Sequence, residues 1–134
     1  MKVYVSAPFQ LIEKARTISD VLHMNRIIVV STWPDTTVTD TPENWKRAAA
    51  GDLAELDQAH ILLAINSIEW GNKGTGGRHV ELGYALARRI PVLLYGDRTH
   101  AFHYDDSVTH IDDPGDFVKA LHRIYQINYT GSKI

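Results

Sequence analysis

The chain has 134 residues, 44% of them hydrophobic, with a formal net charge of −2 and no cysteine. This length fits one domain with a buried core, so we expect a single domain over residues 1–134. A near-neutral charge without a Lys/Arg run argues against nucleic-acid polymers and membranes as partners. The absence of cysteine excludes disulfides and thiol catalysis. Neither a membrane-length apolar run nor a signal-peptide core is present, so we expect a cytoplasmic protein.

Short apolar runs alternate with helical patterns in the first half of the chain. Residues 3–6 and 26–30 are predicted strands, and the helix between them has one apolar face formed by Leu11, Ala15, Ile18 and Leu22. Residues 31–41 are rich in Thr, Asp and Pro and are predicted to form a loop. Pro42 then opens a helix with Trp45, Ala48 and Ala49 on one face. We expect Gly51 to break this helix and Asp52 to restart it.

The same alternation continues to the end of the chain. Residues 61–65 are continuously apolar, which indicates a strand that is buried on both faces. The remaining elements are predicted as a glycine-containing loop at 66–77, a helix at 80–89, a strand at 91–95, a loop at 96–106, a strand at 108–111 and a helix at 116–127.

Strands that alternate with helices predict an α/β fold with a parallel sheet covered on both faces. Five strands favour a flavodoxin-like three-layer sandwich with strand order 2-1-3-4-5. Ligands of such sheets bind beyond the carboxyl ends of the strands. The predicted site therefore lies among the loops at 6–10, 31–41, 66–77 and 96–106.

A glycine-rich turn that leads into a helix is the strongest functional signal. Its sequence, residues 74–85, is GTGGRHVELGYA. We predict Glu81 in the first helical turn, where the positive end of the helix dipole would keep it ionised, as a nucleophile must be. The alternative is a Glu that only offsets the dipole. Gly83 weakens the helix, which suggests close packing against a strand or a ligand.

Asp52 and Glu55 have the spacing of a capping box. A helix cap at this place can also face a ligand, because it precedes the predicted third strand and lies near the sheet edge. The spacing does not separate a structural use from a functional one.

Other polar and aromatic residues near these loops each have two interpretations. Lys73, Arg78 and His79 surround the predicted helix start and either hold a phosphate or form a solvated loop. Trp33 either stacks on a nucleobase or closes an edge of the core.

Several common sites are not expected. His100, His103 and His110 match no zinc spacing, so we expect no metal. The sequence has no Walker A motif, and no GxGxxG follows the first strand, which argues against P-loop hydrolysis and NAD binding.

These motifs together resemble the nucleoside 2-deoxyribosyltransferase superfamily. KVYVSAPF at residues 2–9 resembles the family's first strand and substrate loop, and DLAELDQAHILL at 52–63 resembles its Asp-led helix and third strand. The block GGRHVELGYA at 76–85, followed by RIPV at 89–92, resembles the nucleophile helix and fourth strand. The resemblance covers essentially the whole chain.

The resemblance implies a nucleophilic Glu81 and a substrate-orienting Asp52. The expected substrate-binding residues are Ser6, Phe9, Trp33, Thr75, Gly76, Gly77 and Arg78. Thr75 stands six positions before Glu81, where many transferases of the family have Asp and the related nucleoside 5′-monophosphate N-glycosidases have a hydroxyl residue. A second departure is His60, where an Asp is usual. The resemblance also implies a homo-oligomer in which C-terminal residues complete a neighbour's site.

The implied reaction is cleavage or transfer at the N-glycosidic bond of a 2′-deoxynucleoside through a covalent glycosyl–Glu81 intermediate, with a nucleobase as second substrate and no cofactor. The alternatives are a deoxynucleoside 5′-monophosphate N-glycosidase and a non-catalytic nucleotide-binding module. A phosphoribohydrolase is a further alternative, but its PGGxGTxxE order is not reproduced.

Overall fold

The computed structural model describes residues 1–33, 41–68 and 76–131. Nothing is described for 34–40, 69–75 and 132–134, so Thr75 and Lys73 lie outside the described residues. The strands are β1 (Lys2–Ser6), β2 (Ile28–Val29), β3 (Ile61–Asn66), β4 (Val92–Gly96) and β5 (Val108–Ile111). The helices are α1 (Ile12–Met24), α2 (Pro42–Asp57), α3 (Gly77–Ala87) and α4 (Phe117–Tyr125), with 3₁₀ turns at Phe9–Leu11, Ala101–Tyr104 and Pro114–Asp116 and a π-helix at Gln126–Thr130.

The five strands form one parallel sheet with the order β2-β1-β3-β4-β5. This confirms the predicted α/β class and strand order. β3 lies at the centre of the sheet and is buried along its whole length, as its continuous apolar run predicts. Within the described ranges, no helix is both long and apolar enough to cross a membrane.

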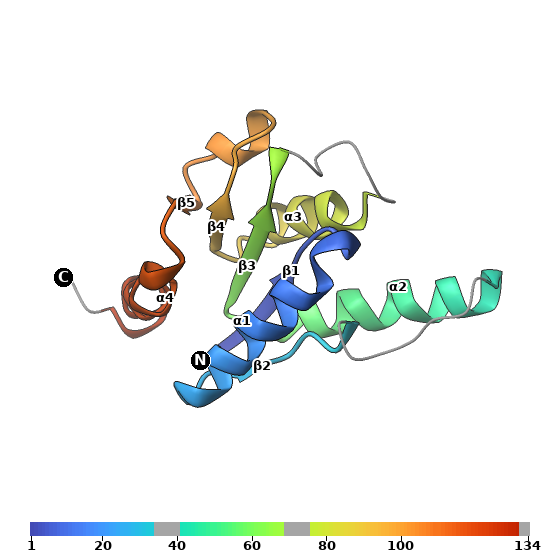
Figure 1. Ribbon diagram of the computed structural model, residues 1–134, viewed down its shortest axis with the longest axis horizontal. Helices are drawn as coiled ribbons and strands as arrows, with labels where there is room; N and C mark the ends of the chain where they lie inside the picture. The colour runs from blue at the N-terminus through green and yellow to red at the C-terminus, as the bar shows by residue number, and fades with distance from the viewer. Residues whose placement is uncertain (34–40, 69–75, 132–134) are drawn as a thin grey trace.

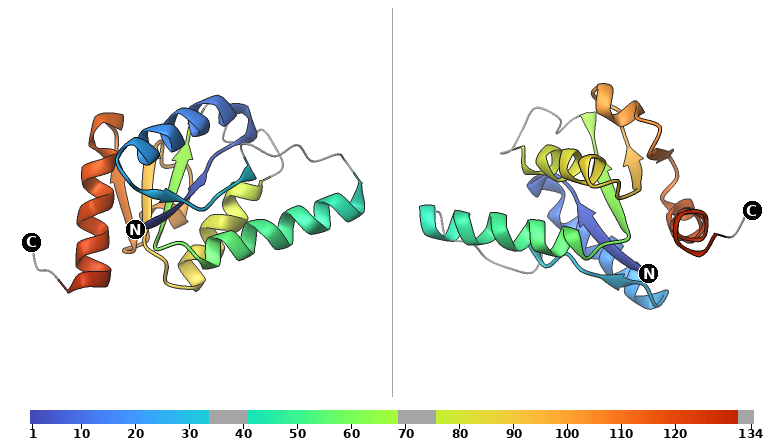
Figure 2. Two further views of the ribbon diagram at one scale, coloured as in Figure 1. Left: turned by 90° about the horizontal axis from the view of Figure 1, so that it is seen from below. Right: turned by 180° about the vertical axis from the view of Figure 1, so that it is seen from behind.

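Helices cover both faces of the sheet, which gives three layers (Figures 1 and 2). α1 and α4 pack on one face, where Ala15, Leu22, Leu121 and other apolar side chains join one core cluster. α2 and α3 pack on the other face through Leu56 and a second cluster. The predicted apolar face of the first helix is therefore confirmed, and α4 likewise buries Phe117, Leu121 and Ile124.

The side chains of β1 alternate between these two layers, as strand geometry requires. Val3 and Val5 point into the core beneath α1 and α4. Tyr4 belongs to the cluster beneath α2 and α3, and Ser6 hydrogen-bonds to α3. β1 therefore presents two hydroxyl groups to the layer that contains Glu81.

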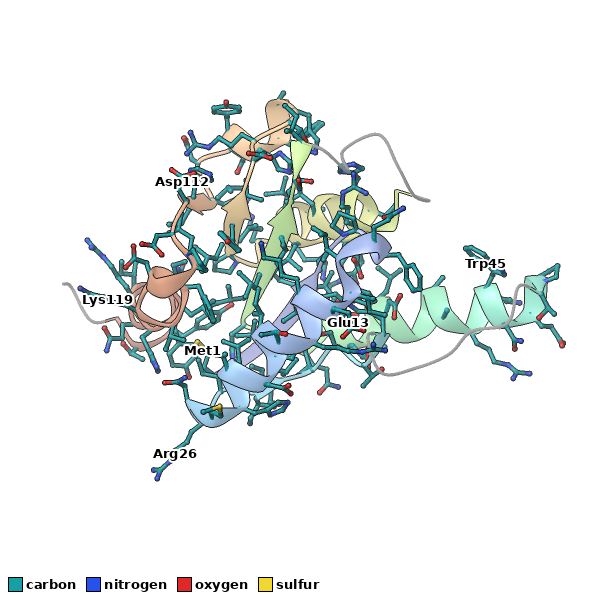
Figure 3. The ribbon with its side chains drawn as sticks, viewed as in Figure 1. Met1, Glu13, Arg26, Trp45, Asp112 and Lys119 are labelled. Atoms are coloured by element: carbon teal, nitrogen blue, oxygen red, sulfur yellow. The ribbon has the colours of Figure 1, made fainter. Side chains whose placement is uncertain are left out.

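The structure contradicts the predicted break at Gly51, because α2 runs without interruption from Pro42 to Asp57. An isolated helical glycine costs only about 1 kcal/mol. The helix start is well capped, since the Thr41 hydroxyl accepts a hydrogen bond from the Asn44 N–H, and the helix end is anchored by buried Leu56. The first half of α2 extends beyond the sheet (Figure 1), and Trp45 is half exposed there (Figure 3).

Other element boundaries also differ from the sequence analysis. β2 has only two residues, and Arg26 at the predicted start of this strand adopts the left-handed conformation with φ 62°. α3 begins at Gly77 and not at residue 80, directly after Gly76 with φ 80°. The regular α-helix of α4 ends at Tyr125 and continues as the π-helix.

The expected close packing of Gly83 against a strand is also wrong, while its packing against a ligand stays a prediction. A Cβ atom added there would meet no described atom within 4 Å, although Gly83 lies in the interior of α3. Gly96 at the end of β4 is the opposite case, because its φ is 107° and a Cβ would lie 2.0 Å from the Asn66 carbonyl oxygen.

We predict that Gly83→Ala raises the free energy of unfolding by about 1 kcal/mol, because alanine loses less backbone entropy in a helix. Gly96→Ala serves as the contrasting variant and should destabilise the protein. Both are measured by urea unfolding monitored by circular dichroism. A loss of stability in Gly83→Ala would show that a contact made by α3 requires the glycine.

Candidate active site

Glu81 is held from two sides by hydroxyl groups of β1. It is the fifth residue of α3, and its side chain points toward the sheet. The Ser6 hydroxyl donates to Oε1 over 2.8 Å, and the Tyr4 hydroxyl donates to Oε2. Both carboxylate oxygens therefore have a donor from the neighbouring strand, which fixes the orientation of the carboxyl group.

The predicted place of Glu81 in the first helical turn is wrong, and so is the expected cause of its ionisation. Because α3 begins at Gly77, Glu81 lies one turn further in, where the helix dipole has less effect. Burial raises the pKa of Glu81 to about 7. The hydrogen bonds from Tyr4 and Ser6 act in the opposite direction and favour the carboxylate, while the charges of Asp52 and Glu55 raise the pKa further.

Tyr4 is a site residue that the sequence analysis missed. It is fully buried, and burial together with the neighbouring Glu81 raises its pKa far above the usual value, so it remains a neutral donor. The alternation of side chains along a strand could have identified it. Ser6 is a predicted site residue, and Tyr4, two positions earlier on the same strand, lies on the same face. A buried tyrosine hydroxyl needs a hydrogen-bond partner, which is here the Glu81 carboxylate.

Asp52 lies inside α2 and does not cap a helix, so the predicted capping box is wrong. Its intended partner Glu55 instead accepts hydrogen bonds from the backbone N–H and the hydroxyl of Thr32, over 3.1 and 2.7 Å. This contact ties α2 to the chain after β2. Burial, with the charge of Glu55 as a smaller contribution, raises the pKa of Asp52 to about 6.

A cavity of about 340 Å³ separates α2 from the start of α3, and both carboxylates line it. This volume lies in the range of small-molecule sites. The cavity brings together the predicted residues Phe9, Trp33, Asp52, Gly76, Gly77, Arg78 and Glu81, with Ala7, Pro8, Ala49, Leu53 and Val80 completing the wall. Ser6 does not line it, and lies behind Glu81.

The two aromatic residues of the cavity are held differently. The Trp33 indole N–H donates to the Val5 carbonyl over 2.7 Å, and the ring also packs against both core clusters. Trp33 therefore closes an edge of the core, which is one of its two interpretations, and its other side lines the cavity, while stacking on a nucleobase stays a prediction. Phe9 is 70% exposed and forms the outer rim.

Three histidines, His79, His100 and His103, lie close together. His79 and His100 approach over 3.2 Å through ring nitrogens, and His100 stacks on His103. His110 Nε2 contacts the Gly96 carbonyl. Within the described residues, no three His, Asp or Glu side chains are placed to hold a metal ion.

Comparisons with known proteins give a clear result at the level of structure. No protein-family model and no curated protein sequence matches the chain. A 2-deoxyribosyltransferase from the psychrotolerant bacterium Bacillus psychrosaccharolyticus superposes with a TM-score of 0.68 and 20% identity, over 87% of this chain and 90% of that one. A CMP N-glycosidase from Clostridium botulinum superposes with a TM-score of 0.61 and 14% identity, over 92% of this chain and 99% of that one.

The chain has the fold of these two enzymes. The expected flavodoxin-like fold is thereby confirmed, and the structural similarity extends over nearly the full length of both neighbours.

Proposed function

We propose that the protein is an enzyme of the nucleoside 2-deoxyribosyltransferase superfamily that cleaves the N-glycosidic bond of 2′-deoxynucleosides and transfers the sugar to a second nucleobase. The observation that carries this proposal is the Glu81 carboxylate, which is oriented by Tyr4 and Ser6 at the wall of a cavity that it shares with Asp52. The neighbours named for deoxyribosyl transfer and for CMP N-glycoside cleavage support the same reaction class.

In the proposed first step, a Glu81 oxygen attacks C1′ of the sugar while the C1′–N bond breaks, and the base leaves with the bonding electron pair. The product is a glycosyl ester on Glu81. In the second step a nitrogen of another base attacks C1′ and the ester oxygen leaves as the carboxylate, so the configuration at C1′ is retained overall. Tyr4 and Ser6 are positioned to hold the carboxylate for attack and to receive it again afterwards.

Asp52 is our candidate for the group that assists the leaving base. A pKa of about 6 means that a useful fraction of Asp52 is protonated near neutral pH, and the protonated form can donate to a base nitrogen. Asp52 and Glu81 share the cavity, and the charge of Asp52 contributes to the raised pKa of Glu81.

Hydrolysis of a deoxynucleoside 5′-monophosphate is the second candidate. Arg78 and the first residues of α3 line the cavity, and a helix start with an arginine is suited to a phosphate group. In this case water replaces the second base. Thr75 occupies the position at which the family's transferases and N-glycosidases differ. It lies outside the described residues.

We also propose that the protein works as a homo-oligomer. Phe9 and Val80 at the cavity wall are 70% and 64% exposed, and Ile68 at the same edge of the sheet is 73% exposed. Apolar side chains gathered at one edge favour contact with a second copy.

The first test is an assay of base exchange. Incubation with deoxyinosine and adenine should yield deoxyadenosine and hypoxanthine, as measured by liquid chromatography. Glu81→Ala should lower this rate by at least about 10³-fold, because the nucleophile of a covalent mechanism is lost. Its circular dichroism spectrum should not change.

Glu13→Gln, an exposed residue on α1, is the matched control and should keep the wild-type rate. Release of free base from deoxynucleoside monophosphates alone would favour the hydrolase. A wild-type rate in Glu81→Ala would rule out the proposed nucleophile.

The second test is the pH dependence of kcat/KM. The active form needs an ionised Glu81 and a protonated Asp52. The protonation steps of Asp52 near pH 6 and of Glu81 near pH 7 make this form most abundant between the two values and less abundant on either side. Since these two steps overlap, we predict a bell-shaped profile with a maximum between about pH 6 and 7. Asp52→Asn should lower the rate and abolish the alkaline decline. An alkaline decline that persists in Asp52→Asn would show that another group is the acid.

A further inference from the structure

A second, much smaller cavity lies behind Glu81, on the side away from the substrate cavity's outer rim. Its volume is about 10 Å³, close to the space that one water molecule occupies. Ser6, Asn66 and His103 line it, and each is at least 94% buried. Ala64 also lines it. Because Ala64 pairs with Ser6 in the β1–β3 register, its short side chain leaves this space open beside the serine.

The polar groups of this cavity have a complementary donor and acceptor pattern. The Asn66 amide nitrogen donates to the Asp97 carbonyl over 2.7 Å and to the Thr99 hydroxyl over 3.1 Å, which fixes the orientation of the amide. The Asn66 Oδ1 atom is buried and accepts no hydrogen bond from any described residue. A buried acceptor of this kind requires a donor.

His103 lines the same cavity and carries one hydrogen-bond donor on its ring. The Thr99 N–H donates to His103 Nδ1 over 3.0 Å, so the neutral ring carries its proton on Nε2. Burial, with the neighbouring His100, His79, Arg78 and His110, lowers the pKa of His103 to about 4, which keeps the ring neutral. Ser6 uses its hydroxyl hydrogen for Glu81, so its oxygen is left as an acceptor.

We propose that this cavity binds one ordered water molecule, which donates to Asn66 Oδ1 and to Ser6 Oγ and accepts from His103 Nε2–H. Such a water has three polar partners, the usual number for a buried water. Because it donates to Ser6 Oγ, it directs the serine hydroxyl hydrogen toward Glu81 Oε1. Asn66 and His103 are thus positioning residues that act on Glu81 through the water and Ser6.

The consequence is a stronger hydrogen bond to the Glu81 carboxylate, because each bond in a chain polarises the next. The groups that act on Glu81 from the packed elements are Tyr4 and Ser6 of β1 and Asp52 and Glu55 of α2. Arg78 of α3 carries a charge at the same cavity. The proposed water strengthens the hydrogen bond from the Ser6 hydroxyl and therefore favours the ionised form of Glu81. The significance for catalysis rests on the proposed function, but the effect on the carboxyl group does not.

The test is a double-mutant cycle on the free protein, read by the pKa of Glu81 from ¹³C NMR titration of its side-chain carboxyl. Asn66→Leu removes the acceptor that orients the water and should raise the pKa of Glu81 by a few tenths of a unit. In the Ser6→Ala background the same substitution should cause no further rise, since the connecting hydroxyl is absent. Thr99→Val, which keeps Asn66 Oδ1 and the backbone N–H, is the control and should shift the pKa less than Asn66→Leu.

A crystal structure of the wild-type protein gives a readout that needs no variant. We expect density for one water within hydrogen-bonding distance of Asn66 Oδ1, Ser6 Oγ and His103 Nε2. A cavity without such density would overturn the proposal, and so would an equal pKa shift from Asn66→Leu with and without the Ser6 hydroxyl. Neither readout uses substrate, so failure here is distinguishable from failure of the proposed enzymatic reaction.

Discussion

Burial of one carboxyl group between two hydroxyl donors is the interaction on which the site depends. Glu81 has a pKa of about 7 against an ordinary value of 4.5, so the folded protein retains a proton that the unfolded chain has released between these two values. The folded state therefore loses stability as the pH rises through this window. Tyr4 and Ser6 offset part of the effect by hydrogen bonding to the carboxylate. A partly desolvated and oriented carboxylate is also a stronger nucleophile than a hydrated one.

The parallel sheet explains how residues from distant parts of the chain reach Glu81. Ser6 and Ala64 are paired in register, as are Asn66 and Gly96, so the carboxyl ends of β1, β3 and β4 meet at one edge. The period of two in β1 turns both Tyr4 and Ser6 toward α3. α2 then closes the other wall with Asp52, and the contact between Glu55 and Thr32 holds that wall in place.

The elements that could be predicted from the sequence are those with strong apolar periodicity. β3 is an uninterrupted apolar run, and α1 and α4 have regular apolar faces, so their existence, and from them the strand order, followed from local pattern. Gly51 was misjudged because a glycine's local preference is weak compared with the capping and packing that stabilise α2. The roles of Tyr4 and Glu55 depend on pairs of residues 77 and 23 positions apart in the chain, and local spacing does not report such contacts.

The central claim is that Glu81 forms a covalent bond to the sugar. The most direct measurement is mass spectrometry of the wild-type protein after acid quenching during turnover of deoxyinosine, with peptide mapping of the adduct. We predict a mass increase of one deoxyribosyl group, located on the peptide that contains Glu81 and absent from Glu81→Gln. Base exchange that proceeds without any adduct on this peptide, or an adduct on a different residue, would contradict the account.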